Sequence, residues 1–328
     1  MFRAMAASII SLALMLVVAP RFIEWLRRNE FGQNIREEGP EGHHVKAGTP
    51  TMGGLLIWFA VLIPFLALSR LAVASLTVAI CTFGCAFIGF LDDWLSIVRK
   101  RSLGLHARYK ILLQLGLALF VGFVALHFGG VDTSLKLPVP HHNLNVGTFF
   151  YYAIVFIVIA GFSNAVNLTD GLDGLAAGSS AIVLIAFFGI AFILGRQLHD
   201  PGLQDLMILG GCIGGACLGF LWFNAFPADV FMGDTGSLGL GGAIAGMAIL
   251  TRTEIFLLLI AGLFVVEALS VMAQVVSFKL FHRRVLLMAP LHHHFELKAW
   301  SETKIIVRFW IIGAICSGAG FALYYWSF

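Results

Sequence analysis

Ten long apolar stretches determine what this chain can fold into. Their approximate ranges are 5–23, 52–69, 71–91, 111–130, 148–166, 174–195, 205–223, 236–250, 255–278 and 305–326. About 20 apolar residues in an α-helix cross a bilayer while satisfying their own backbone hydrogen bonds. With 59% hydrophobic and 12% charged residues, the chain has too little polar surface for a soluble globule. We therefore predict an all-α, polytopic integral membrane protein with ten transmembrane helices. No soluble domain interrupts it, so residues 1–328 are expected to form a single membrane-embedded domain.

Basic residues are unequally divided between the two sides of this predicted bundle. Of 21 Lys and Arg residues, 16 fall in or beside the connections on one side and 5 on the other. Because cytoplasmic loops are enriched in Lys and Arg, the richer side is predicted to be cytoplasmic and both termini periplasmic. The first stretch lacks a small-residue cleavage pattern and runs into Arg21, so it is expected to remain as an anchor. These basic residues lie beside the membrane, so their expected partners are lipid headgroups or substrate phosphates. No nucleic-acid partner is expected.

Acidic and imidazole side chains gather in the loops of the predicted cytoplasmic face. They are Asp92, Asp93, Asp170, Asp173, Asp229, Asp234 and the run His292–His294. Such groups are costly next to hydrocarbon, so their accumulation at one end of many apolar spans indicates a polar site there. Glu267 is the only acidic residue well inside a predicted span.

The first two acidic groups have both structural and functional interpretations. Asp92 and Asp93 end the third predicted span, where the helix dipole disfavours negative charge. The two carboxylates could simply form a solvated helix end, above all at Asp93. Alternatively, a metal or Lys110 could compensate their charge in a functional site.

The loop Asn167–Gly174 also has two interpretations, because it contains ordinary turn and capping residues. Two aspartates three residues apart beside several amides exceed the needs of one cap, which favours a polar ligand such as a nucleoside.

The last two groups suggest phosphate chemistry. Gly233–Ser237 combines glycines, which permit close backbone approach, with Asp234, a hard oxygen ligand suited to Mg²⁺. Asp229 is interpreted as a solvated turn residue. Three consecutive histidines cannot face one point on a regular helix, and they have no Cys partners, so a structural zinc site is disfavoured. We expect His292–His294 to donate to phosphate oxygens from an irregular loop; a histidine-rich interfacial loop is the alternative.

Five segments of the chain are informative in combination: Lys46–Gly54, Asp92-Asp93, Asn167–Gly174, Gly233–Ser237 and Pro290–Glu296. Together they resemble the phospho-N-acetylmuramoyl-pentapeptide transferase family, within the polyprenyl-phosphate N-acetylhexosamine-1-phosphate transferase superfamily. The match extends from about residue 20 to 310. The resemblance implies Mg²⁺-dependent transfer of phospho-MurNAc-pentapeptide from UDP-MurNAc-pentapeptide to undecaprenyl phosphate, giving lipid I and UMP. It also implies a homodimer in the bacterial inner membrane, with the active site on the cytoplasmic face.

The resemblance also assigns roles to individual positions. Asp234 matches the magnesium ligand and Asp92 the proposed base, with Asp93 in support. Positions matched to the nucleoside are Lys46, Gly171, Leu172, Asp173, Asn224, Gln274 and Phe231, the last of which stacks on uracil. Positions matched to phosphates or catalysis are Lys110, Asn164, Asn167, Asp170, His292, His293 and His294. One position departs from the family pattern Asp-Asp-x-x-Lys: Ser96 replaces the lysine, so any role of that lysine is absent or passes to Lys100 or Lys110.

Phosphoryl transfer between two anions needs charge neutralisation and in-line placement. Mg²⁺ on Asp234, with Lys110 and the histidines, would serve that purpose. Whether Asp92 acts as a base stays open, because the second pKa of a phosphate monoester is about 6; Asp92 could instead orient the lipid phosphate or hold the metal. Direct attack is favoured over a covalent aspartyl-phosphate. Two other activities are weighed: a GlcNAc-1-phosphate transferase, which should differ in the histidine loop, and an ion-coupled transporter, whose sites should lie near the bilayer midplane.

Overall fold

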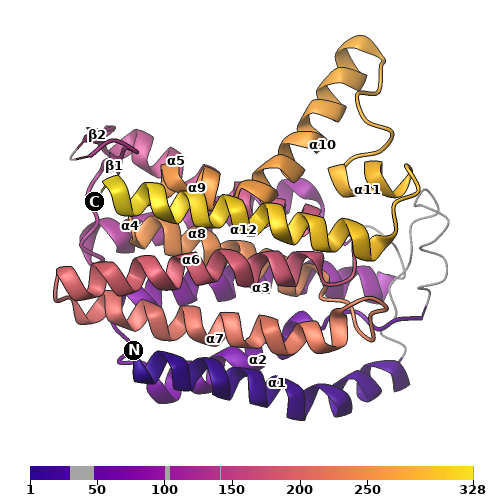
Figure 1. Cartoon of the computed structure of the whole chain (residues 1–328), viewed down its shortest axis with the longest axis horizontal. Helices are drawn as coiled ribbons and strands as arrows, with labels where there is room; N and C mark the ends of the chain where they lie inside the picture. The colour runs from indigo at the N-terminus through magenta and orange to yellow at the C-terminus, as the bar shows by residue number, and fades with distance from the viewer. Residues whose placement is uncertain (30–47, 100–103, 141, 328) are drawn as a thin grey trace.

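The computed structural model describes residues 1–29, 48–99, 104–140 and 142–327. Its helices are α1 (Phe2–Arg28), α2 (Gly54–Leu68), α3 (Val73–Arg99), α4 (Ala107–His127), α5 (Gly147–Thr169), α6 (Leu175–Gln197), α7 (Pro201–Asn224), α8 (Gly233–Leu250), α9 (Glu254–Ile260), α10 (Gly262–Phe281), α11 (Leu291–Glu296) and α12 (Glu302–Ser327). The long helices run back and forth along one axis, and both chain ends lie at the same end of the bundle (Figure 1).

Eight of the described helices are long and apolar enough to cross a membrane: α1, α3, α4, α5, α6, α7, α10 and α12. The prediction of an all-α, polytopic membrane protein is therefore confirmed. Helices α2 and α8 lie where the second and eighth spans were expected, but α2 has only 15 residues and α8 is a Gly-rich helix of 18. Ten crossings and periplasmic termini stay predictions.

The expected ninth span is not one helix. The chain breaks between α9 and α10 at Ala261, and α10 leans away from the other helices (Figure 1). On α12, the Ser317 hydroxyl donates a 2.6 Å hydrogen bond to the Ile260 carbonyl. A side chain that takes a main-chain carbonyl out of the helical ladder is a common cause of a kink. The prediction of a continuous helix over 255–278 is wrong for this reason.

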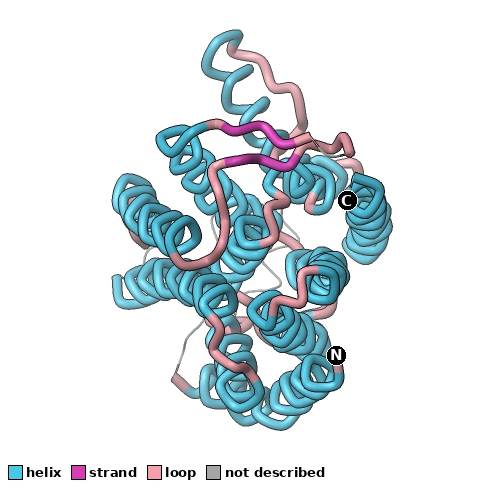
Figure 2. Tube along the Cα trace, turned by 90° about the vertical axis from the view of Figure 1, so that its left-hand side faces the viewer, coloured by secondary structure: helices cyan, strands magenta, loops and turns pink. Residues whose placement is uncertain are grey.

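A short hairpin interrupts the all-α pattern at the end that carries the termini. Strands β1 (Ser134–Lys136) and β2 (Asn143–Asn145) pair antiparallel across that end of the bundle (Figure 2). Arg252, in the turn before α9, donates to Asp132 at 2.8 Å and to the Ser134 carbonyl at 2.9 Å. The hairpin is therefore fixed to the helices rather than free.

Helix α8 forms the centre of the bundle. All its residues from Thr235 to Leu250 are buried, and it packs against α3, α5, α2 and α6. Glycines allow this packing: a β-carbon on Gly242 would lie 2.7 Å from the β-carbon of Cys85 on α3. Because α8 begins at Gly233, Asp234 lies in the first turn of this central helix.

Candidate active site

Asp234 is the hub of a polar cluster at the start of α8. Lys110 on α4 places its Nζ 2.9 Å from Asp234 Oδ2 and 3.1 Å from Asp92 Oδ1. Asn167 on α5 donates to Asp234 Oδ1 at 2.7 Å and to the Ser237 hydroxyl at 2.9 Å. The side chains of Lys110, Asp92 and Asp234 are 16%, 17% and 24% exposed. Two carboxylates and one ammonium from three helices therefore meet where a solvent-borne ligand can reach them.

Asp93 has a different function in the structure from its neighbour. Its oxygens accept hydrogen bonds from Asp234 N at 3.0 Å, Thr235 N at 2.9 Å and the Thr235 hydroxyl at 2.6 Å. Met232, at the N-cap position of α8, offers no side-chain cap. A carboxylate from α3 thus caps α8 and complements the positive end of its dipole. Asp93 orients the backbone that carries Asp234.

The third helix extends further than predicted. It continues to Arg99, so Asp92 and Asp93 lie before its last turn rather than at its end. The unfavourable dipole was expected to require a compensating cation, and Lys110 provides it for Asp92. Asp92 Oδ1 also accepts from Leu105 N at 3.0 Å, whereas Oδ2 accepts no hydrogen bond from the described part of the chain.

Three backbones meet at Asp234 without side chains between them. A β-carbon on Gly54 would lie 2.2 Å from Gly236 N, and one on Gly89 would lie 2.1 Å from the Asp234 carbonyl oxygen. The strand-like segment before α2 also binds the segment before α8: Phe231 N donates to the Pro50 carbonyl, and Gly53 N donates to the Phe231 carbonyl, at 2.8 and 2.9 Å. The predicted nucleotide-stacking aromatic is therefore held beside the carboxylates by main-chain contacts.

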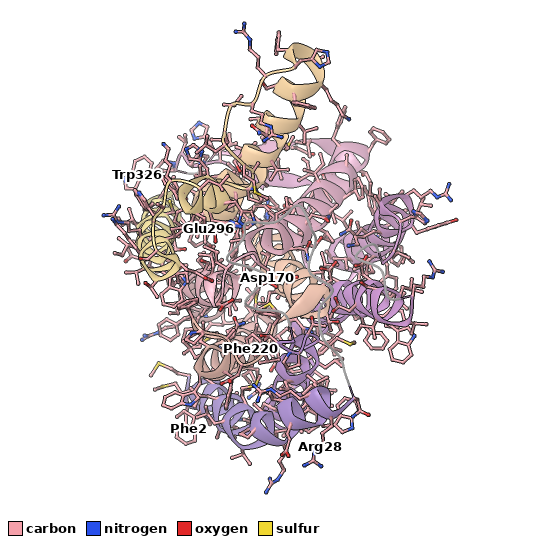
Figure 3. The ribbon with its side chains drawn as sticks, turned by 90° about the vertical axis from the view of Figure 1, so that its right-hand side faces the viewer. Phe2, Arg28, Asp170, Phe220, Glu296 and Trp326 are labelled. Carbon is pink, nitrogen blue, oxygen red and sulfur yellow. The ribbon has the colours of Figure 1, made fainter. Side chains whose placement is uncertain are left out.

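The loop between α5 and α6 contributes Asp170, which lies near the middle of the end face in Figure 3. Burial, and then the charges of Asp234, Asp93 and Asp173, raise the pKa of Asp170 well above its usual range. Its carboxylate accepts no hydrogen bond from the described residues. A crowded, unpartnered carboxylate beside two others is a site at which a cation would relieve repulsion.

The remainder of this loop is anchored from three sides. Asp173 Oδ2 accepts from Ala228 N at 3.0 Å, and Asp173 N donates to Glu302 on α12 at 3.0 Å. Asn224 is buried at the end of α7, where it accepts from Gly174 N and donates to the Val230 carbonyl, at 3.0 and 2.9 Å. Both ends of the Asn224 amide are thus occupied by backbone, so its observed role is to fix the loop to the segment before Phe231.

The three histidines do not lie in an irregular loop, as the sequence analysis expected. They lie on the short helix α11, from which their rings reach different partners. His292 is fully buried beside Glu267, 3.3 Å from its Oε2. His293 contacts Glu296, and His294 Nδ1 accepts from Leu287 N at 3.1 Å. The prediction of a loop is wrong, because the chain turns helical at Leu291, directly after Pro290 in the N-cap position.

Other predicted residues are placed as follows. Asn164 donates to the Ala160 carbonyl at 2.7 Å and to Gln114 at 3.3 Å, within the α4–α5 contact. Gln274 on α10 binds the backbone of Leu286 at 2.9 and 3.0 Å. Lys46 and Lys100 lie outside the described residues. Asp229 is exposed and pairs with Arg27 at 3.2 Å, as expected of a solvated turn.

Several polar residues of this region were not among the predicted site residues. They are Gln114, Thr235, Ser237, Glu267 and Glu302. Gln114 lies one helical turn after Lys110, so helical spacing could have predicted that it shares the Lys110 face. Glu302 approaches the site through a tertiary contact that leaves no local signal. Glu267 is marked in the sequence by its position deep in a span, but its partner is not.

The donor set fits a magnesium ion that keeps waters and substrate phosphates. No three His, Cys, Asp or Glu side chains of the described residues converge as a closed metal cage. Mg²⁺ is ordinarily bound by one or two carboxylates plus phosphate oxygens, which such a cluster can supply. Lys110 Nζ already lies between two carboxylate oxygens as a cation would. Asp234 and Asp170 are the side chains we consider as ligands.

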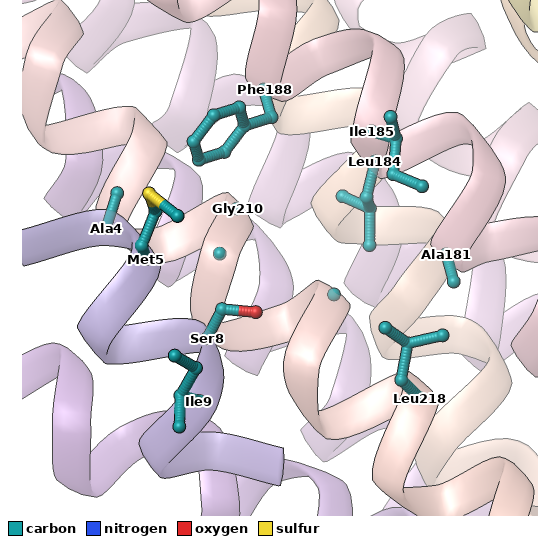
Figure 4. A pocket seen from close by; sticks show the side chains of 12 residues that line it. Ala4, Met5, Ser8, Ile9, Ala181, Leu184, Ile185, Phe188, Gly210 and Leu218 are labelled. Atoms are coloured by element: carbon teal, nitrogen blue, oxygen red, sulfur yellow. The ribbon is translucent and has the colours of Figure 1, made fainter. Parts of the chain in front are cut away.

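An apolar pocket lies elsewhere, between α1, α6 and α7 (Figure 4). Its lining includes Met5, Ile185, Phe188 and Leu218, and Ser8 supplies its single polar side chain. Phosphates need charge neutralisation, so this pocket is not the place for them.

Comparison with known proteins agrees with the geometry. The family model described as glycosyl transferase family 4 matches residues 75–252, and the phospho-N-acetylmuramoyl-pentapeptide-transferase signature 1 matches residues 46–57. The chain is 44% identical to a phospho-N-acetylmuramoyl-pentapeptide-transferase of Rubrobacter xylanophilus, covering 99% of this chain and 98% of the relative. Proteins of the same name from a Geobacillus species and Thermodesulfovibrio yellowstonii are 45% and 47% identical, covering 98% and 96% of this chain and 97% and 90% of the relatives. The chain therefore belongs to the phospho-N-acetylmuramoyl-pentapeptide transferase family and is a transferase enzyme built into a membrane.

Proposed function

We propose that the protein transfers phospho-MurNAc-pentapeptide from UDP-MurNAc-pentapeptide to undecaprenyl phosphate, with Mg²⁺, on the cytoplasmic face of a bacterial inner membrane. The products would be lipid I and UMP. The observation that carries the proposal is the Lys110 bridge between Asp92 and Asp234 at the polar end of an apolar bundle. Full-length relatives named for this transfer support the choice of substrate.

The phosphate site is assigned to the cluster around Asp234. When bound there, Mg²⁺ would neutralise charge on the pyrophosphate from which UMP leaves. Asn167 orients Asp234, and Lys110 adds a positive charge beside it. Asp92 Oδ2 is the carboxylate oxygen free to take a proton from, or to orient, the attacking lipid phosphate. We favour direct attack of that phosphate on the sugar-linked phosphorus.

The nucleoside site is assigned to the space between Phe231 and the loop Gly171–Asp173. Asn224 binds the backbone of both segments, which supports a site that is formed before substrate arrives. Lys46 and Gln274 remain proposed contributors from the family resemblance. Asn164 is proposed to support the phosphate site through Gln114. His293 and His294 are both partly exposed, and we propose them for phosphate contact because His292 is buried.

Two other activities are less well supported. A GlcNAc-1-phosphate transferase would share the aspartates, but residues 46–57 match the muramoyl signature. An ion-coupled transporter would need polar groups near the bilayer midplane, whereas Asp170 and Asp234 lie at helix ends and Asp92 lies near the end of α3. We also propose a homodimer, on the family resemblance.

The decisive assay measures UMP released from UDP-MurNAc-pentapeptide in the presence of undecaprenyl phosphate and Mg²⁺. Release that needs all three components is expected, with UDP-GlcNAc as the competing donor. Equal use of UDP-GlcNAc would favour the sister activity, and absence of UMP with either donor would overturn the proposal.

A further inference from the structure

Glu267 is a buried carboxylate that the proposed reaction does not use. It lies on α10, fully buried, and a charged group inside a membrane helix is costly unless it is paired. Its Oε2 accepts a hydrogen bond from Leu291 N at 2.8 Å and lies 3.3 Å from His292 Nδ1. Oε1 has no hydrogen-bond partner within the described chain. The carboxylate thus contacts the first two residues of α11 at once.

His292 connects Glu267 to the loop after α5. A β-carbon on Gly171 would lie only 2.3 Å from His292 Nε2, so the ring packs directly on the Gly171 backbone. Neither ring nitrogen makes a hydrogen bond within the described chain, although the ring is fully buried. With Glu267 on the Nδ1 side and Gly171 on the Nε2 side, the imidazole is enclosed between α10 and the loop.

A separate apolar cluster surrounds this contact. Its buried members are Leu172, Leu175, Leu263, Ile305, Ile306 and Phe309. Leu172 follows Gly171 directly, and Leu263 lies one helical turn before Glu267 on α10. Leu291 and Phe295 of α11 pack against the same cluster. The loop therefore rests on a small core built from α10, α11 and α12, and Glu267 supplies the polar contact at its edge.

We infer that Glu267 is a positioning residue: acting through His292, it holds the loop Asp170–Asp173 in the conformation that binds the nucleotide part of the substrate. The contact chain stands on the structure alone, and only the identity of the substrate rests on the proposed function. Carboxylates that orient a functional histidine through its other ring nitrogen are a general device.

A double-mutant cycle tests whether Glu267 acts through His292. Glu267→Gln keeps the size and an acceptor for Leu291 N but removes the charge. We expect the KM for UDP-MurNAc-pentapeptide to rise about tenfold, the lower end of the losses found when partners of functional histidines are removed, with a smaller change in kcat. Glu267→Asp, which keeps the charge, should restore part of the loss. In a His292→Ala background, Glu267→Gln should add no more than about twofold, because the coupling has already been lost.

Ser277→Ala is the matched control, since it removes an α10 hydrogen bond to the Arg283 carbonyl without touching His292. Its KM should equal that of the parent. If Glu267→Gln raised the KM by the same factor in the parent and in the His292→Ala background, the inference would be overturned.

Hydrogen exchange supplies a readout that needs no substrate. Amides of residues 167–175 should exchange faster in Glu267→Gln than in the parent or in Ser277→Ala. Unchanged exchange would overturn the inference, and this measurement decides alone if the His292→Ala chain does not fold. A parent protein that releases no UMP, yet shows the exchange difference, would remove the proposed function and leave the positioning role.

Discussion

Asp93 and Asp234 are both aspartates of the site, but their oxygens contact different groups. Asp234 faces Lys110 and Asn167, whereas Asp93 accepts main-chain N–H groups at the start of α8. Asp234→Asn should lose most activity and regain part of it at high Mg²⁺, because an amide oxygen is a weaker ligand than a carboxylate. Asp93→Asn should lower the free energy of unfolding by about 0.5 to 2 kcal/mol, as other lost caps do, without rescue by Mg²⁺. Activity against Mg²⁺ concentration and thermal unfolding would check both; equal rescue would contradict the distinction.

Phe231 is predicted to bind the uracil ring. Phe231→Ala should raise the KM for the UDP substrate, because stacking of a base on an aromatic ring is worth about 1 to 3 kcal/mol. The backbone bonds of this segment to Pro50 and Gly53 do not need the ring, so the fold should persist. Trp222→Ala, which removes a 76% exposed aromatic of α7, is the control and should leave KM unchanged. An unchanged KM for the Phe231 variant would exclude stacking there.

Asp170 should make stability depend on pH. Burial and neighbouring carboxylates raise its pKa in the folded protein, so the folded state keeps a proton that the unfolded chain, with a pKa of about 4, has released. The free energy of unfolding should therefore fall as pH rises from the unfolded pKa through the folded pKa. Asp170→Asn should remove this pH dependence of the free energy of unfolding. Without Mg²⁺, the variant should unfold at a higher temperature than the parent at pH 8 and at about the same temperature as the parent near pH 4. A parent that is equally stable at both pH values would contradict the assignment.

At this scale, residue type and helix-end position predicted much of the site from the sequence. The compensation of Asp92 by Lys110 was expected from the helix dipole and is observed. The capping role of Asp93 and the double engagement of Asn224 were not predictable, because both depend on which helix lies next to which. Glu267 carried a signal as the only acidic residue deep in a span, but not the identity of its partner.

Asp205 shows the same dependence on tertiary contacts at the level of an element. From α7 it accepts hydrogen bonds from the Ser69 and Ser75 hydroxyls, both at 2.6 Å, and from the backbone N–H groups of Arg70 and Ala72. One carboxylate therefore fixes the whole connection between α2 and α3. Asp205→Asn should cost about 1.5 to 3 kcal/mol of stability, as lost hydrogen bonds to charged groups do. Thermal unfolding should show the loss while the KM of the folded fraction is unchanged; a changed KM would mean that the connection reaches the site.

The elements themselves were predicted well where apolar length alone decides them. The break at Ala261 was not predicted because residues on both sides are apolar and because Ser317 lies 57 positions from Ile260, whose carbonyl it binds. The hairpin and α11 escaped because strands of three residues and a helix of six are too short for periodicity to reveal.

For the whole molecule, the location of both termini at one end agrees with an even number of crossings (Figure 1). A cysteine placed at Ser301, exposed at the end with the carboxylates, should be labelled only by reagents that cross the membrane. A cysteine at the exposed His199 should react from outside. The unmodified chain, with its own five cysteines, gives the background. The reverse labelling pattern would place the site on the other side of the membrane and contradict the proposed use of a nucleotide substrate.

The backbone contact of Gly54, Gly89 and Gly236 limits how this enzyme can change over generations. None of the three carries a functional group, yet an added methyl group at Gly54 or Gly89 would push apart the helices that hold Asp234. Gly116, Gly161 and Gly214 have open space instead, so a β-carbon there would meet no neighbouring atom. Inherited variation around the site should therefore be confined to side chains that face the ligand. Substitutions of those side chains could change what the site binds, whereas the helix crossings at Gly54 and Gly89 would have to stay as they are.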